Sequence, residues 1–159
     1  MEGDDNLMRD SNSYYILQVS DFHISEESQE EAVAALKTLT NKLKELKINI
    51  SYLIHTGDVI NAKDIGGKIR EAYGEDIEDE QYDKYLDEIV SQRFDIAEKI
   101  MNKFINDLDV LHKNIVICCG NHDKCRYKMR KENAFDQFKN FVGKIGTEEH
   151  NELTSAYSL

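Results

Sequence analysis

Three short apolar segments, each followed at once by polar residues, constrain this 159-residue chain more than any other feature. The segments lie at residues 14–19 (YYILQV), 50–55 (ISYLIH) and 114–119 (NIVICC). Apolar runs of this length, bounded by polar residues, predict short strands buried in a parallel sheet, and we expect residues 14–19 to be buried on both faces. The polar groups that follow are Ser20-Asp21-Phe22-His23, Thr56-Gly57-Asp58 and Gly120-Asn121-His122-Asp123.

Helical patterns separate these segments. Residues 28–46 repeat apolar positions at helical spacing, and Ser28 with Glu31 predicts a capping box at the start of that helix. Residues 80–111 predict one long helix or two joined helices, and residues 124–142 predict a further helix. Gly66-Gly67 indicates a loop or hinge. The order of strand, helix and strand predicts an α/β fold with a largely parallel sheet and right-handed crossovers.

The chain length fits one domain of ordinary size. We expect residues 1–13 to be a disordered lead-in and residues 14–142 to form the domain, with a helical insertion at about 62–111. Residues 143–159 show no strong period and are expected to be a tail or a truncated continuation.

The charge is strongly negative but uneven. A formal net charge of −11 argues against a general nucleic-acid coat protein. Residues 124–131 nevertheless carry five basic side chains and no acid. One interpretation is a solvated helix face. The alternative is that Lys124, Lys128 and Lys131 attract a phosphate-bearing substrate.

Cysteine usage and hydropathy bear on the cellular compartment. Cys118, Cys119 and Cys125 do not resemble a disulfide framework, so we expect reduced thiols and a cytoplasmic protein. The first 13 residues lack the apolar core of a signal peptide. No apolar stretch approaches the roughly 20 residues of a membrane span, and no membrane association is expected.

The polar groups have a consistent chemistry. Ligands collect at the carboxyl ends of strands in an open α/β sheet, so distant residues can converge there. Asp21 and Asp58 offer carboxylates, His23 an imidazole and Asn121 a carbonyl oxygen. This mixture suits Mn, Fe or Zn better than calcium.

In a two-metal site one carboxylate bridges the ions, and Asp58 is the candidate. His122 is the candidate general acid or charge stabiliser for the leaving oxygen. Asp123 is placed with the catalytic residues because it could orient that imidazole; the alternative is that it caps the next helix.

The motifs Asp21-x-His23, Gly57-Asp58 and Gly120-Asn121-His122-Asp123 resemble the first three motifs of the calcineurin-like metallophosphoesterases. The resemblance implies an α/β/β/α sandwich and two divalent metal ions, with manganese as the first choice. It implies that Asp21 and His23 belong to the first metal, Asp58 bridges, Asn121 binds the second metal and His122 is catalytic.

Two departures from the family pattern shape the expectation. The third motif ends in Asp123, which resembles the branch of phosphodiesterases and DNA-repair nucleases more than the protein phosphatases. The later histidine motifs of the family are absent, and His150, the only histidine after His122, lies in a polar segment. We therefore expect the first half of the sandwich with one sheet face uncovered, completed by the remainder of a longer protein or by self-association. His55 and His112 are expected to be structural.

Three functional hypotheses remain. The first is a metal-dependent phosphoester hydrolase, of phosphodiesterase or nuclease type, acting on a nucleotide, nucleic acid or other phosphoester. The second is a catalytically inactive metallophosphoesterase-like module that binds a metal or a partner. The third is an unrelated α/β domain with fortuitous carboxylates.

Overall fold

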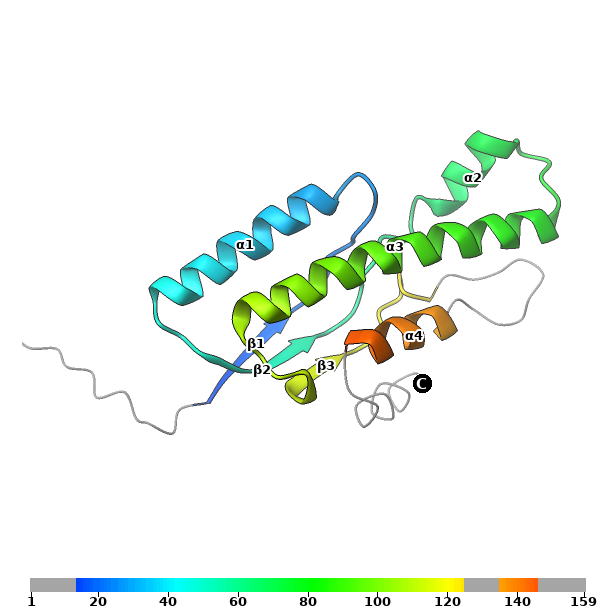
Figure 1. Cartoon of the computed structure of the whole chain (residues 1–159). Helices are drawn as coiled ribbons and strands as arrows, with labels where there is room; N and C mark the ends of the chain where they lie inside the picture. Colours follow the sequence, from blue (N-terminus) through cyan, green and yellow to red (C-terminus); the bar gives the residue numbers. More distant parts are fainter. Residues whose placement is uncertain (1–13, 125–134, 146–159) are drawn as a thin grey trace, which may run out of the picture.

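The computed structural model describes residues 14–124 and 135–145 and shows an α/β fold on a three-stranded parallel sheet (Figure 1). The strands are β1 (Tyr15–Val19), β2 (Ile50–His55) and β3 (Ile115–Ile117), in the spatial order β1-β2-β3. Both neighbours pair with β2 in parallel, as predicted. The central position of β2 places the residues after it between the other two strand ends.

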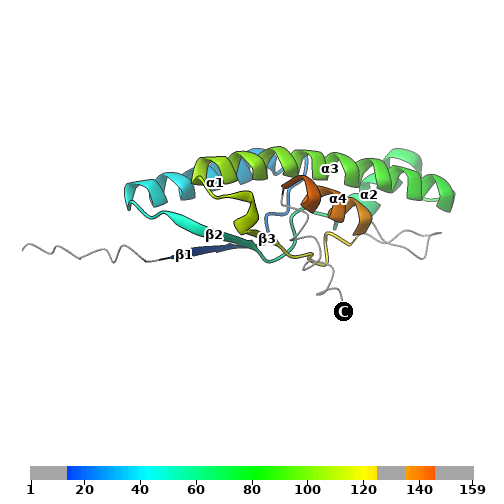
Figure 2. The ribbon, with the colours of Figure 1, turned by 60° about the horizontal axis from the view of Figure 1, so that its bottom comes forward.

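The helices form one layer against one face of this sheet (Figure 2). Helix α1 (Gln29–Glu45) connects β1 to β2. Helices α2 (Ile65–Tyr73) and α3 (Asp79–Leu108), followed by the short 3-10 helix η1 (His112–Asn114), connect β2 to β3, and α4 (Phe135–Ile145) follows β3. The predicted helical region near 80–111 is one helix of 30 residues. The predicted α/β class and parallel sheet are confirmed, and the described residues supply one sheet and one helical layer.

The core lies between the sheet and α3, the longest helix. Leu53 of the central strand is fully buried, and Ile115 and Ile117 of β3 are nearly so. The buried apolar side chains of α3 recur at intervals of three and four residues, which places them on one face of the helix. They include Leu86, Val90, Phe94, Ala97, Ile100, Met101, Phe104 and Ile105.

The opposite face of the sheet has no cover among the described residues. Ile16 and Tyr52 are register partners on that face, and they remain 63% and 44% exposed. The prediction that residues 14–19 are buried on both faces is therefore wrong, because every described helix lies on the other side (Figure 2). The expectation that one sheet face would be uncovered is confirmed for this part of the chain.

Gly66 and Gly67 lie inside α2, so the predicted loop or hinge there is wrong. Ile65 and Ile69, one turn apart, are both buried, and their packing outweighs the low helix propensity of two glycines. Gly66 also has a packing role, because an added Cβ would lie 3.0 Å from the Tyr82 hydroxyl of α3.

The start of α1 was predicted correctly, but for the wrong reason. Ser28 occupies the N-cap position without a side-chain capping bond. Its hydroxyl instead donates to the carbonyl oxygen of His23 at 2.8 Å and accepts from the Ser25 N–H at 2.9 Å. The serine therefore organises the loop that carries His23.

Several predictions concern other parts of the chain. The predicted helix at 124–142 is observed from Phe135 onwards, Lys124 is not helical, and residues 125–134 lie outside the described residues. The predicted lead-in at 1–13 and residues 146–159 of the predicted tail at 143–159 also lie outside them, whereas residues 143–145 form the end of α4. Cys118 and Cys119 are free thiols, as expected, and Cys125 lies outside the described residues. No helix in the described ranges has both the length and the apolar character to cross a bilayer.

Candidate metal centre

The loops after β1 and β2 run side by side beyond the ends of their strands. The Asp21 N–H donates to the Gly57 carbonyl at 3.1 Å, and the His23 N–H donates to the Asp58 carbonyl at the same distance. Ile24 and Ile60, both fully buried, form an isolated parallel bridge one step further on. The backbone thereby fixes the relative position of the first two motifs.

The loop after β3 approaches Asp58 so closely that glycine is required. A Cβ at Gly120 would lie 2.0 Å from Asp58 Oδ1, and a Cβ at Gly57 would lie 2.9 Å from Gly120 Cα. Gly57 also has φ +119°, a conformation that other residues rarely adopt. The His122 N–H donates to Asp58 Oδ1 at 2.9 Å, which joins the second and third motifs.

Three of the predicted metal ligands have left-handed backbone conformations. Asp21 has φ 56°, His23 has φ 45° and Asp58 has φ 57°. Such values are uncommon for non-glycine residues and cost of order 1 kcal/mol or more each unless the surroundings impose them. Here the backbone hydrogen bonds between the loops impose them. Strain of this kind concentrates at functional sites.

The side chains of His23, Asp58 and His122 converge. Their ligand atoms lie within 4.8 Å of one another, as expected for residues that could hold a metal ion. The His23 and His122 rings are 4.5 Å apart between centroids, at 73°. Asp21 Oδ1 lies 3.7 Å from His23 Nε2. The Asp58 and Asp21 carboxylates with the His23 imidazole are a mixed donor set that fits a divalent transition metal, and His122 lies beside them.

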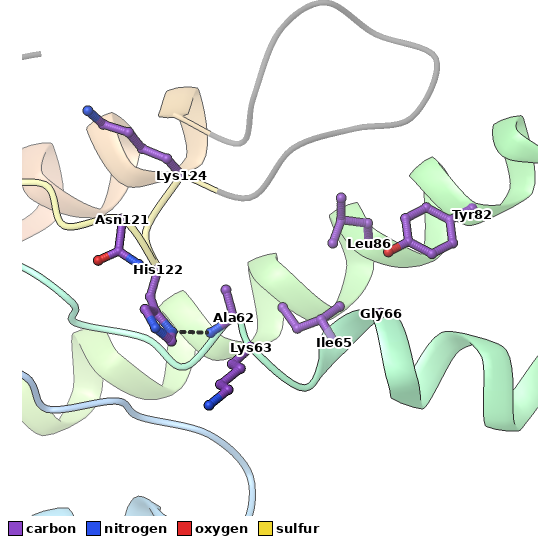
Figure 3. A pocket seen from close by; sticks show the side chains of 9 residues that line it. All are labelled: Ala62, Lys63, Ile65, Gly66, Tyr82, Leu86, Asn121, His122 and Lys124. Atoms are coloured by element: carbon purple, nitrogen blue, oxygen red, sulfur yellow. Dashed lines mark hydrogen bonds between the residues drawn. The ribbon is translucent and has the colours of Figure 1, made fainter. Parts of the chain in front are cut away.

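His122 has a defined tautomer in its neutral form. Its Nδ1 accepts a hydrogen bond from the Ala62 N–H at 3.2 Å (Figure 3). An imidazole that accepts at Nδ1 carries its proton on Nε2. In this state Nε2 is a hydrogen-bond donor and not a metal ligand, which favours stabilisation of charge on the leaving oxygen over ligation.

Asp123 is fully buried, and its carboxylate binds backbone groups. Oδ1 accepts from the N–H groups of Val59 at 2.9 Å and Ile60 at 3.1 Å, and Oδ2 accepts from the Gly120 N–H at 2.9 Å. Burial raises its pKa to about 6, while these donors act in the opposite direction by stabilising the carboxylate. The residue ties the second loop to the third. Its predicted catalytic role stays a prediction.

Asn121 and Lys124 flank the same loop. Asn121 is exposed and Lys124 is half-buried, and both line a pocket next to His122 (Figure 3). Predicted ligation by Asn121 stays a prediction. Lys128, Lys131 and His150 lie outside the described residues.

The remaining titratable groups near the strands have structural settings. Burial lowers the pKa of His55 to about 4, and its Nδ1 accepts from the Gly57 N–H at 3.2 Å. His112 Nδ1 is hydrogen-bonded to the Ile145 carbonyl at the end of α4. Burial raises the pKa of Cys119 to about 12, so its thiolate is disfavoured. These settings agree with the structural roles expected for both histidines.

Arg93 of α3 is a residue that the sequence reasoning missed. Its side chain is fully buried, and it donates to the carboxylates of Glu26 at 2.9 Å and Asp64 at 2.8 Å and to the Asn61 carbonyl. Glu26 follows the first motif, while Asn61 and Asp64 follow the second. The sequence did contain a sign of this role, because Arg93 is a charged residue at a core-facing position of α3, next to Phe94.

The chain is thus an α/β protein in which side chains that could hold a metal ion lie together at the carboxyl ends of three parallel strands. The profile of the calcineurin-like phosphoesterase family matches residues 14–156, and the chain belongs to that family. Searches among curated proteins and among solved structures gave no significant match. Membership confirms the resemblance carried by the three motifs, and it assigns metal-dependent phosphoester hydrolysis as the chemistry of the family in general.

Proposed function

We propose that this protein is a metal-dependent phosphoester hydrolase of phosphodiesterase or nuclease type, with two divalent cations, manganese being the first choice. The observation that carries the proposal is the convergence of His23, Asp58 and His122 from three strand ends. Asp21 and His23 would hold the first ion, Asp58 would bridge and Asn121 would contribute to the second. The bound cations would supply Lewis acidity and an activated water.

The chain's own residues have separable tasks in this proposal. His122 carries its proton on Nε2, because Nδ1 accepts from the Ala62 N–H, and the Nε2–H can donate a hydrogen bond that stabilises the developing charge on the leaving oxygen of the ester. The His122 N–H donates to Asp58 and holds its carboxylate in position. The carboxylate fits there only because Gly120 has no side chain. Lys124, beside His122, would attract the phosphate. The free thiols support a cytoplasmic location.

The test is a calorimetric titration of manganese into the protein and into Asp58→Asn, with hydrolysis of bis(p-nitrophenyl) phosphate assayed on the same samples. Two bound ions with turnover, both lost in Asp58→Asn, would support the proposal. Metal binding that is unaffected by Asp58→Asn would contradict it, because Asp58 is the proposed bridge.

A second candidate function is a module that binds a metal or a partner without turnover. The uncovered sheet face with Ile16 and Tyr52 favours it, since such a face invites association with a C-terminal remainder or with another copy. One bound ion, no turnover and a concentration-dependent sedimentation coefficient would support this second candidate over the first.

A further inference from the structure

A pocket of about 440 Å³ opens directly beside the candidate metal centre. Asn121 and His122 line one end of it, and Tyr82 and Leu86 of α3 line the other (Figure 3). Ala62 and Ile65, at the start of the α2 region, lie between the two ends. Small-molecule pockets have volumes of about 300–1,000 Å³, so this one is large enough for a ligand group the size of a nucleoside.

The two ends of the pocket differ in polarity. Lys63 and Lys124 lie toward the His122 end, and their ammonium groups point away from Tyr82 and Leu86 (Figure 3). The far end is built from Tyr82, Leu86 and Ile65, which are 9%, 3% and 1% exposed. A ligand that matches this arrangement is anionic at one end and apolar at the other.

Tyr82 lines the apolar end from a fixed position. It is packed against α2, where Gly66 leaves just enough room for its hydroxyl: an added Cβ would lie 3.0 Å away. The small part of Tyr82 that stays exposed lines the pocket, and contact between this aromatic side chain and a planar ring adds to the burial of area, a gain that an alkyl chain lacks.

We propose that the pocket between His122 and the α2–α3 helices binds an aromatic group esterified to the phosphate on which the metal centre acts. The ligand class is a phosphoester with a planar ring in its alcohol part, either a nucleotide or a simple aryl ester. The inference rests on the proposed function only in placing the phosphate at the metal centre. The helices that form the apolar end belong to the connection between β2 and β3, so this connection determines substrate choice.

The first experiment measures binding by calorimetry in the presence of manganese. The ligands are methyl phosphate, hexyl phosphate, phenyl phosphate and thymidine 5′-monophosphate. We expect at least one aromatic ligand to bind about tenfold or more tightly than methyl phosphate, the scale of a good ring contact. The ratio of the affinities for phenyl phosphate and for the nucleotide shows whether the pocket prefers a simple aryl group or a nucleoside. Equal affinity for all four ligands, or tightest binding of hexyl phosphate, would overturn the proposal.

Leu86→Ala is the informative variant and Ile100→Ala is its matched control. Both residues are buried apolar positions of α3, but only Leu86 lines this pocket. Leu86→Ala should reduce the affinity ratio between the aromatic ligands and methyl phosphate to near one. Ile100→Ala should retain this ratio, although it should lower the melting temperature by a comparable amount. A preference retained in Leu86→Ala, or lost equally in both, would overturn the assignment.

A second readout separates this inference from the proposed function. In the presence of EDTA, saturation-transfer NMR should detect contact between the protein and the thymine protons of the nucleotide, and Leu86→Ala should abolish it. If this contact is observed but no manganese-dependent turnover is found, the pocket assignment stands and the proposed hydrolase function is rejected. Turnover without contact in either condition would reject the pocket alone.

Discussion

Arg93→Met tests whether the buried cation of α3 holds the loops of the metal centre together. In the native protein the guanidinium donates to Glu26, Asp64 and the Asn61 carbonyl. Breaking a fully buried ion pair costs about 3–5 kcal/mol. Glu26 and Asp64 remain 37% and 36% exposed, and Lys68 stays 3.2 and 3.3 Å from their carboxylates. Solvent and Lys68 therefore reduce the expected loss of unfolding free energy to about 2–3 kcal/mol.

The loss should depend on pH in a defined direction. The hydrogen bonds from Arg93 lower the pKa of Asp64 from 3.8 to about 2. Burial is the largest single influence on Glu26 and acts to raise its pKa, but the hydrogen bonds and charge of Arg93, a backbone hydrogen bond and the Lys68 hydrogen bond together lower the pKa. A carboxyl with a depressed folded-state pKa stabilises the fold above its ordinary pKa, and the contribution disappears as the pH falls toward the folded value. The difference between native and Arg93→Met should therefore be complete at neutral pH and shrink between about pH 4 and pH 2.

Urea unfolding near pH 7 and near pH 3 measures this difference. Arg70→Met is the control, because Arg70 is 51% exposed and lies 3.7 Å from the exposed Glu75, and it should change the unfolding free energy by less than about 0.5 kcal/mol. A loss below about 1 kcal/mol for Arg93→Met at pH 7, or an equal loss at both pH values, would refute the reasoning.

Three further predictions concern the loop after β3. Gly120→Ala should weaken manganese binding, measured by calorimetry, by about 10–100-fold, because the added Cβ would lie 2.0 Å from Asp58 Oδ1. Gly67→Ala is the control and should leave this affinity unchanged, because no atom lies within 4 Å of its added Cβ. His122→Ala should lower kcat by about 10²–10⁴-fold and leave manganese affinity intact, and a parallel loss of affinity would identify His122 as a ligand instead. Asp123→Ala leaves the buried N–H groups of Val59 and Ile60 and the half-buried N–H of Gly120 without their acceptor. The unfolding free energy measured in urea should therefore fall by about 3 kcal/mol, and a loss below about 1 kcal/mol would contradict that role.

The elements that the sequence predicted well are those with a strong local pattern. The strand at 50–55 was predicted residue for residue, and the start of α1 was placed correctly. The long helix α3 was recognised because its apolar residues recur at three and four along 30 residues. The errors fell where contacts distant in sequence outweigh local preference. Gly66 and Gly67 are helical because Ile65 and Ile69 are buried under α3.

The candidate site divides in the same way. Asp21, His23, Asp58 and His122 were identified from sequence because each follows an apolar strand, and strand ends of a parallel sheet meet at one edge. Their exact relation was not predictable, because it depends on backbone hydrogen bonds between loops that lie more than 30 residues apart, such as His23 with Asp58.

The sequence by itself determined the α/β class, the three motifs and the family, because these depend on the type and spacing of residues along the chain. Only the tertiary structure decided that Arg93 joins two of the loops, that Asp123 binds backbone N–H groups and that His122 carries its proton on Nε2. It also decided which sheet face is covered and that α2 and α3 form a pocket beside the metal centre. The physical reason is that burial and hydrogen-bond partners are properties of segments brought together in space, and spacing along one segment does not specify them.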